Sequence, residues 1–516
     1  MINRIKHKLI IILSVFSMML IALPQLVCQN ICGLKYDYIW ILGGIDKDTI
    51  PDENGGCEIN FNTSPPSLNL NYKPIRNPLQ NTSICSPSGD LLFYSNGCSV
   101  FNSIDEIMEN GDTLNPGEIF EMSCPQHGYV GFQNMFAIPD SYNDSIYYLF
   151  YLDLVFNREP NAPFIVQPEH LYCTTIDMAG DNGHGMVKEK NMIILQDTSM
   201  MGDPMSAVKH ANGIDWWIIT PNRWSNSFNR ILLDSGGPHF VDRQYIGMKP
   251  DSAAEGGQGK FSPDGSHFAW FHPRNGLFLY DFDREEGLLS NFRRINIPHT
   301  DFISGGCEFS PTGRFLYVNH DTSLFQLDML APDIQSSLTH IADFDGFTDV
   351  VSTYFFFMER TPDKRIIMNV LNGSEWLHVI QEPDKKGAAC RFEQHAIKLP
   401  TINNLTIPHF PNYRLGALGD PLCDSLMVST EPSLDSKEDI YKIVPNPASD
   451  YITIQYSGRG GETPVNISIT DISGQTVLFS HELQINISNV PAGFYILTIM
   501  EEAKLIQQSK LIISNR

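Results

Sequence analysis

Apolar and polar residues alternate along much of this chain, and the pattern is clearest between residues 259 and 297. The runs SHFAWFH (266–272) and LFLYDFD (277–283) each alternate, and short turns rich in Gly, Asn and Asp separate them. Strict alternation predicts strands with one buried face, and such short turns predict hairpins between neighbouring strands. The segment therefore predicts four antiparallel strands that form one up-and-down sheet.

This four-stranded unit recurs at a spacing of about 50 residues. The turn proline of the unit, Pro263, is followed 48 residues later by Pro311 and a further 51 residues later by Pro362. Three earlier unit starts lie at Pro87, Pro139 and Asn212. The interval between the last two is about 20 residues too long, which predicts an insertion around residues 157–181.

A period near 50 residues is typical of a β-propeller, in which each repeat is one four-stranded blade. Six blade starts are recognisable in the sequence. We expect residues 36–42 and 408–415 to join as a seventh blade, because closing the ring removes exposed strand edges. The prediction is an all-β fold with about seven four-stranded blades over residues 33–425, although six or eight blades are compatible with the pattern.

Both ends of the chain carry patterns of a different kind. Basic residues between positions 4 and 8 precede an apolar run from 9 to 23, which is shorter than the roughly 20 residues that span a bilayer. This pattern predicts a cleaved signal peptide over residues 1–28. No later segment is long and apolar enough to predict a membrane span. The polar stretch 426–440 predicts a linker, because it has no hydrophobic periodicity.

The last 76 residues, 441–516, carry several short motifs in a fixed order. These are P-N-P, a strand ending in D-x-x-G, P-A-G before an aromatic strand, and a basic-apolar final strand; their key residues are Pro445, Asn446, Pro447, Gly474, Gly493 and Lys510. The order resembles the C-terminal sorting domain of the Bacteroidetes type IX secretion system. The resemblance implies a small Ig-like β-sandwich, handling by the type IX machinery, and delivery through the periplasm to the cell surface or the medium.

The body of the chain resembles a group of secreted Bacteroidetes-type propellers that often carry this tail. Matching stretches include 89–97, 261–265 and 412–416, and together such stretches cover most of residues 36–425. The resemblance implies fold and export, but it implies no particular activity.

Composition and missing motifs narrow the function. Aromatic residues make up 11% of the chain, which suits many short strands, and the formal net charge is −24. Such a charge argues against nucleic acid as a partner, because phosphate binding needs clustered Lys and Arg. The sequence contains no G-x-S-x-G elbow, no H-E-x-x-H and no phosphate-binding glycine loop. The common hydrolase classes that use these motifs are therefore not predicted.

Ten cysteines are present, nine of them after the predicted cleavage point, so an exported chain would keep at least one free thiol. Cys85 and Cys98 flank one predicted hairpin and could pair across it. The alternative is that both are free and buried, as cysteines in cores often are.

The segment DFDGFTD contains the best candidate metal ligands, Asp343, Asp345 and Asp349. Alternating carboxylates before a glycine can surround a hard cation such as calcium with oxygen ligands. The segment is shorter than a full calcium loop and lacks its distal Glu, and an Asp-Gly turn is the alternative interpretation. Apart from this possible calcium ion, the sequence predicts no cofactor.

A cluster of tryptophans could suit a sugar ligand. Adjacent Trp216 and Trp217 would face opposite sides of a strand, so at least one is expected in the core. Trp224 is the better candidate for an exposed ring, with Arg223 and Asn222 near it to reach hydroxyl groups.

The sequence therefore predicts a secreted or cell-surface propeller that acts as a non-enzymatic binding or adhesion module for a glycan or a surface protein. One alternative is a propeller enzyme that acts on extracellular polysaccharide, which should gather two or three inward carboxylates. Another is a scaffold without a ligand. The fold alone does not choose between these functions.

Overall fold

The structure is a computed structural model of the 516-residue chain. It describes residues 31–513 apart from 44–55, 72, 75–79, 126–127, 159–165, 251–256, 299–303, 350, 372, 404–406, 421–422, 424–440, 447, 457–464, 472–475, 492 and 502–503. The predicted signal peptide 1–28 and linker 426–440 thus lie outside the described residues. The chain divides into two compact units, residues 1–427 and 428–516.

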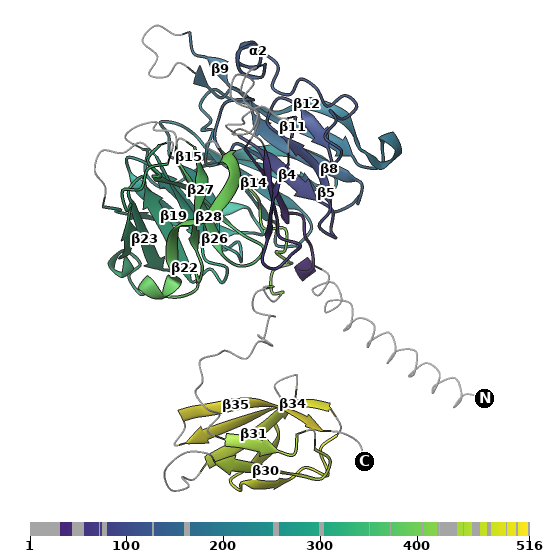
Figure 1. The fold of residues 1–516 in the computed structure, drawn as a ribbon, viewed down its shortest axis with the longest axis vertical. Helices are drawn as coiled ribbons and strands as arrows, with labels where there is room; N and C mark the ends of the chain where they lie inside the picture. Colours follow the sequence, from purple (N-terminus) through teal and green to yellow (C-terminus); the bar gives the residue numbers. More distant parts are fainter. Residues whose placement is uncertain are drawn as a thin grey trace, which may run out of the picture. The chain divides into compact units, whose positions relative to one another are not determined.

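Seven small antiparallel sheets and one two-stranded hairpin make up the described part of the first unit (Figure 1). The first sheet contains β1 (Ile39–Leu42), β2 (Cys57–Asn60) and β3 (Ser67–Leu70), and the second contains β4 (Thr82–Cys85), β5 (Leu91–Ser95) and β6 (Val100–Asn102). The third contains β7 (Met135–Pro139), β8 (Ile146–Leu152), β11 (His170–Asp177) and β12 (Met186–Gln196). The short helix α2 (Glu118–Ser123) lies between the second and third sheets in the chain.

The remaining four sheets each contain four strands in chain order. They are β13 (Ser206–Lys209), β14 (Trp216–Pro221), β15 (Ser227–Asp234) and β16 (Gly237–Tyr245); β17 (Gln258–Phe261), β18 (His267–His272), β19 (Gly276–Asp283) and β20 (Leu288–Ile295); β21 (Gly305–Phe309), β22 (Phe315–His320), β23 (Ser323–Asp328) and β24 (Thr339–Asp343); and β25 (Phe355–Arg360), β26 (Ile366–Val370), β27 (Ser374–Ile380) and β28 (Phe392–Asn403). The four strands predicted between 259 and 297 are confirmed as β17–β20.

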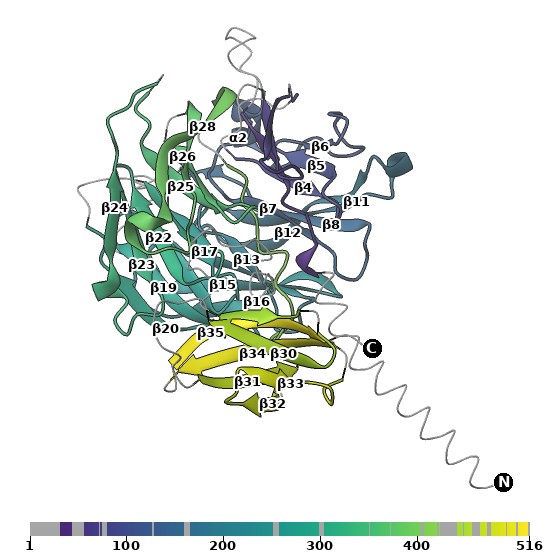
Figure 2. The same ribbon diagram turned by 60° about the horizontal axis from the view of Figure 1, so that its bottom comes forward.

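The first strands of neighbouring sheets lie beside one another. β1 contacts β4 and β4 contacts β7, while β13, β17, β21 and β25 contact in that order. Residues on these strands are almost all buried, because they are covered by the strands on either side, whereas the last strands of the sheets, apart from the short β6, are largely half-exposed or exposed. The last sheet also meets the first one, since β28 contacts β2 and β3. Figure 2 shows the green β28 next to the purple start of the unit.

Two details of the predicted repeat were wrong. Residues 408–415 form no strand and join no sheet; the first sheet is built from β1–β3 instead. Pro408 and Pro411 explain the difference, because proline cannot donate to a strand ladder. The predicted insertion around 157–181 is present, but it lies earlier in the chain than expected. It consists of the residues between β8 and β11 and contains the hairpin of β9 (Val155–Phe156) and β10 (Val166–Gln167), whereas β11 belongs to the third sheet.

The second unit contains two antiparallel sheets. One contains β29 (Tyr441–Val444), β30 (Tyr451–Tyr456) and β33 (Gln484–Asn486). The other contains β31 (Val465–Asp471), β32 (Thr476–Ser480), β34 (Gly493–Glu501) and β35 (Lys504–Ile513). Alternating isoleucines and leucines from both sheets share one buried cluster, as the alternation of their sequences requires.

Among the residues that the structure describes, no helix has the length and apolar character needed to cross a membrane.

Candidate functional site

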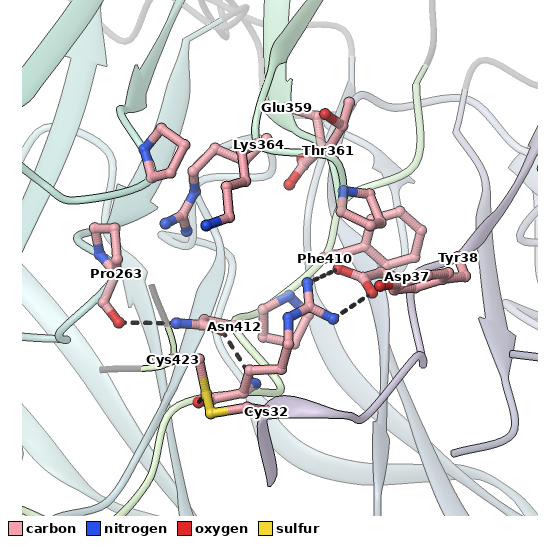
Figure 3. A pocket seen from close by; sticks show the side chains of 15 residues that line it. Cys32, Asp37, Tyr38, Pro263, Glu359, Thr361, Lys364, Phe410, Asn412 and Cys423 are labelled. Atoms are coloured by element: carbon pink, nitrogen blue, oxygen red, sulfur yellow. Dashed lines mark hydrogen bonds and ion pairs between the residues drawn. A yellow bond between two sulfur atoms is a disulfide. The ribbon is translucent and has the colours of Figure 1, made fainter. Parts of the chain in front are cut away.

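A cavity of about 190 Å³ opens where three turns of neighbouring sheets meet the two ends of the first unit (Figure 3). The turns follow β17, β21 and β25 and contribute Pro263, Pro311 and Pro362. The remaining wall includes charged, aromatic and sulfur-containing side chains from the end of β25, from the start of the unit and from its last residues: Glu359, Arg360, Lys364, Asp37, Tyr38, Phe410, Arg414, Cys32 and Cys423. We call this cavity the turn pocket.

The two ends of the first unit are joined at the turn pocket. A disulfide links Cys32 to Cys423, which are 391 residues apart in the sequence. Beside it, the guanidinium group of Arg414 donates to both carboxylate oxygens of Asp37 at 2.7 and 2.6 Å. These bonds fix one wall of the turn pocket and hold the C-terminal segment against the start of the unit.

The second disulfide joins Cys98 to Cys124, so the pairing considered between Cys85 and Cys98 is wrong. The register explains this result. Cys85 lies opposite Leu91 at one end of the β4–β5 hairpin, and Cys98 follows the other end of β5. Cys85 is a buried free thiol instead.

A cluster of five ionisable side chains, four of them buried, adjoins the turn pocket; it consists of Lys260, Glu308, Glu359, Arg360 and His409, and we call it the ion cluster. The amine of Lys260 contacts the carboxylate of Glu359, lies 3.3 Å from Glu308 Oε2 and lies 3.0 Å from Nδ1 of His409. Arg360 Nε is 3.1 Å from Glu308 Oε1. The side chains of Lys260, Glu308 and Glu359 are at most 4% exposed.

The repeat explains why these residues meet. Lys260, Glu308 and Glu359 each stand three positions before the turn proline, on the adjacent strands β17, β21 and β25. Equivalent positions of a repeat share the same face of their strands, so their side chains converge. The recurrence of a charged residue three positions before the turn proline is the signal from which the ion cluster could have been predicted.

Burial controls the protonation of the ion cluster. Removal from water raises the pKa of Glu359 to about 7, against the opposing attraction of Lys260. Burial raises the pKa of Glu308 as well, and Lys260 and Arg360 offset part of the effect. The pKa of His409 is lowered well below its usual value by burial and by the Lys260 amine. His409 is therefore neutral near pH 7, with Nδ1 accepting a hydrogen bond from Lys260.

The two inward carboxylates of the ion cluster are poorly placed for catalysis of glycoside hydrolysis. Such catalysis needs one acid and one base or nucleophile that both reach the sugar. Glu308 has no exposed surface, and Glu359, although it lines the turn pocket, is only 4% exposed and contacts Lys260. The arrangement can orient charged groups at the back of a pocket, but it offers no exposed carboxylate pair.

The tryptophan prediction is confirmed as far as burial is concerned. Trp216 and Trp217 are 1% and 5% exposed, whereas Trp224 is 41% exposed. Asn222 and Arg223 belong to the same β14–β15 turn but are buried, so they do not share that surface. The backbone N–H of Arg223 donates to the Ser199 carbonyl at 2.6 Å, so the turn is fixed to the preceding loop. Trp224 has φ 54°, an unusual conformation for a bulky residue.

The three aspartates of the DFDGFTD segment have separate partners. Asp343 accepts hydrogen bonds from Ser323 at 2.7 Å, Asp345 from the backbone N–H of Phe347 at 2.9 Å, and Asp349 from Ser374 at 3.3 Å. Within the described part of the chain, no group of three His, Cys, Asp or Glu residues is arranged to hold a metal ion. Calcium binding here stays a prediction.

The described residues of the sorting motifs lie in or next to strands of the second unit. Pro445 and Asn446 follow β29, Gly493 begins β34, and Lys510 lies in β35 opposite Ile496. Pro447 and Gly474 lie outside the described residues.

Residues 442–514 match the family model described as the secretion system C-terminal sorting domain. The chain therefore carries a type IX sorting tail and is exported through the periplasm to the cell surface or the medium. The match confirms the resemblance found in the sequence, and it covers the tail alone.

No curated protein matches the chain by sequence. Solved structures similar to it include a candidate 6-phosphogluconolactonase from Bacteroides uniformis, with 12% identity, coverage of 72% of this chain and 98% of that one, and a TM-score of 0.41. PorZ, a surface component of the type IX secretion system of Porphyromonas gingivalis, is 10% identical. The match covers 90% of this chain and 68% of PorZ, with a TM-score of 0.31. The periplasmic gluconolactonase PpgL of Pseudomonas aeruginosa is 12% identical. The match covers 92% of this chain and 100% of PpgL, with a TM-score of 0.34. At these scores we draw no functional argument from the likeness.

Proposed function

We propose that this exported protein is a β-propeller that binds an extracellular glycan at the turn pocket without transforming it. The seven sheets of the first unit would close into a ring of seven blades over residues 33–425, and the tail 441–516 would be an Ig-like sandwich. The contacts of β28 with β2 and β3 support ring closure, because they bring the last sheet beside the first. Residues 1–28 and 426–440 would be the signal peptide and the linker.

One observation favours a binding function over a catalytic one. The inward carboxylates of the ion cluster are neutralised by Lys260 and Arg360, and Glu308 has no exposed surface. An enzyme acting on polysaccharide would need such carboxylates free to reach the substrate. The turn pocket in front of them combines a fixed wall of charged groups with two aromatic side chains, Tyr38 and Phe410, which suits recognition of a sugar.

The test is a binding screen with the full exported protein. Purified protein would be titrated with extracellular polysaccharides and their oligosaccharides, and the products would be separated by chromatography after prolonged incubation. Saturable binding with intact oligosaccharides supports the proposal. Release of shorter products would overturn it in favour of the enzyme, and the absence of saccharide binding would leave a protein partner or a scaffold.

A second candidate surface surrounds Trp224. It is favoured by the combination of an exposed indole ring and a left-handed backbone, since strain of this kind is often kept at functional positions. Trp224→Ala removes the exposed indole ring from the β14–β15 turn. If the glycan stacks on this ring, its affinity should fall about two- to tenfold in a titration of the variant, the equivalent of about 0.5–1.5 kcal/mol for an aromatic contact. If the affinity is unchanged, the glycan binds at another surface.

A further inference from the structure

A second, much smaller cavity lies between turns of the third and fourth sheets. Its volume is about 10 Å³, which is room for one group the size of a water molecule. Its wall includes Asp140 and Tyr142 from the β7–β8 turn, and Ile214, Trp216 and Asp234 from the fourth sheet and its turns. We call it the small cavity. It shares no lining residue with the turn pocket.

The small cavity has a hydrogen-bond donor without an acceptor in its wall. Trp216 is 1% exposed, and its Nε1 has no hydrogen-bond partner among the described residues. A buried donor without an acceptor is unfavourable, so such groups usually bond to water or to a ligand. Trp270 also has a buried indole N–H without an acceptor, but it lies in β18 and lines neither cavity. At Trp216, a single acceptor atom of the size of a carbonyl oxygen fits the volume beside the ring.

Three carboxylates converge on the exposed Tyr142 beside the small cavity. Its hydroxyl donates to Asp215 Oδ1 at 2.8 Å. This hydrogen bond and the charges of Asp234 and Asp140 raise the pKa of the Tyr142 hydroxyl. Asp140 accepts from the backbone N–H of Tyr142 at 2.7 Å and Asp234 from that of Gly236 at 2.8 Å. These donors are neutral, and no lysine or arginine among the described residues forms an ion pair with any of the three carboxylates.

The amine of Lys209 is the positive charge that packs beneath this surface. It lies 5.2 Å from the centre of the Trp216 ring and donates to the Gly213 carbonyl at 3.0 Å. Burial lowers the pKa of Lys209 to about 8, so part of its charge is lost near that pH. The outer surface above the ring is therefore acidic.

Two exposed aliphatic side chains border the carboxylates. Ile214 is 42% exposed and Leu418 is 70% exposed. The N–H of Leu418 donates to the Ala211 carbonyl at 2.7 Å, which holds the end of the first unit beside the β13–β14 turn. Exposed large apolar side chains with a polar rim are typical of protein–protein contacts, whereas sugars pack on aromatic faces. We call this surface the acidic patch; it consists of Asp140, Tyr142, Ile214, Asp215, Asp234 and Leu418.

The charges and the free donor together favour one kind of occupant. A basic peptide segment offers lysine or arginine side chains to the carboxylates and apolar side chains to Ile214 and Leu418. Its backbone carbonyls are acceptors for the Trp216 N–H. A bare metal ion would suit the carboxylates but not the indole donor, because both are positive. A second copy of this chain would carry the same net charge of −24 and would be repelled.

We propose that the acidic patch docks a segment of a partner protein in which lysine or arginine residues stand between apolar ones. A backbone carbonyl of this segment accepts a hydrogen bond from Trp216 in the small cavity. This docking function is additional to glycan binding at the turn pocket and does not depend on it.

The test is a calorimetric titration of the full exported protein with a short synthetic peptide of alternating lysine and leucine residues. The same peptide with glutamine in place of lysine and an oligomer of glucosamine, which is an amine-bearing glycan, are the comparisons. We expect saturable binding of the lysine peptide that weakens with added salt. The glutamine peptide should bind at least about tenfold more weakly, because it meets the carboxylates without a charge.

Asp234→Asn is the decisive variant, because asparagine keeps an acceptor for the Gly236 N–H and removes the charge. Asp333→Asn is its matched control. Asp333 accepts the equivalent hydrogen bond from the N–H of Gln335, two residues on, at 3.1 Å, but it lies outside the acidic patch. We expect Asp234→Asn to weaken binding of the lysine peptide about two- to fivefold, as the loss of one exposed ion pair predicts. Asp333→Asn should bind like the native protein, and an equal effect of the two substitutions would overturn the proposed location.

The indole N–H resonance of Trp216 gives a second readout, which charge alone does not control. In protein with isotope-labelled tryptophan, this resonance is assigned from the spectrum of Trp216→Phe. We expect it to shift when the lysine peptide binds, while the resonance of Trp270 stays in place. An unmoved Trp216 resonance, or no saturable binding of the lysine peptide, overturns the proposal and leaves glycan binding at the turn pocket untouched. Tighter binding of the glucosamine oligomer overturns the choice of a protein partner.

Discussion

The ion cluster makes a quantitative prediction for Lys260→Met. The native amine contacts Glu359 and lies 3.3 Å from Glu308, and all three side chains are almost fully buried. Methionine has a similar volume, so the substitution removes the charge with little change in packing. Removing one partner of a buried ion pair typically costs about 3–5 kcal/mol, because the remaining charge stays buried without compensation. We expect a loss in this range at pH 8, where two carboxylates are affected.

The loss should depend on pH in a defined direction. In the variant, the folded-state pKa values of Glu308 and Glu359 rise further above those of the unfolded chain. A carboxyl group with a raised folded pKa contributes stability below its unfolded pKa and loses it as the pH rises through the folded pKa. Glu359 already has a pKa of about 7 in the native protein. The difference between native protein and variant should therefore be smaller at pH 5 than at pH 8.

Urea unfolding of the full chain, followed by tryptophan fluorescence at both pH values, measures this difference. Lys209→Met is the matched control, because Lys209 is buried but donates to the Gly213 carbonyl at 3.0 Å and lies over the Trp216 ring. Its removal leaves no buried carboxylate behind, so its cost should be about 1 kcal/mol or less. A loss below about 1 kcal/mol for Lys260→Met, or an equal loss at the two pH values, would refute the role assigned to the ion cluster.

Three further predictions concern the tail, the aspartate segment and the joined ends. Deleting the chain from Ile443 onward should leave the protein in the periplasm, which cell fractionation detects; normal surface delivery would contradict the sorting role. If the aspartate segment binds calcium, EDTA should lower the melting temperature of the native protein but not of Asp345→Ala, and an unchanged melting curve would leave the segment as a turn. Replacing Cys32 and Cys423 by serine should cost about 2–5 kcal/mol of stability, because the disulfide restricts a long stretch of the unfolded chain. The same urea assay would detect this loss, and an unchanged midpoint would contradict it.

The repeat unit was predictable because its signals are local. Alternation between 259 and 297, with Gly- and Asn-bearing turns, specifies β17–β20 without reference to any distant residue. Residues 408–415 were misassigned for a related reason. Their aromatic and apolar residues are typical of a strand, but pairing depends on a neighbouring strand and on donors that Pro408 and Pro411 lack.

The turn pocket was not predicted, because its residues come from distant parts of the sequence. Asp37 and Arg414 are 377 positions apart, and no local pattern relates them. Even so, one signal was present in the sequence: Lys364 stands where the aligned turns have glycine. Its left-handed backbone and its position at the cavity are seen only in the structure.

The sequence by itself determined the strand period, the antiparallel units and the sorting tail, because hydrophobic alternation, turn residues and short motifs act over a few neighbouring positions. Only the tertiary structure decided which cysteines pair, which basic side chains neutralise Glu308 and Glu359, and where a pocket opens. These features depend on distances between residues that lie up to 391 positions apart. Packing of the sheets sets those distances, and a buried charge is tolerated only where packing also brings its partner.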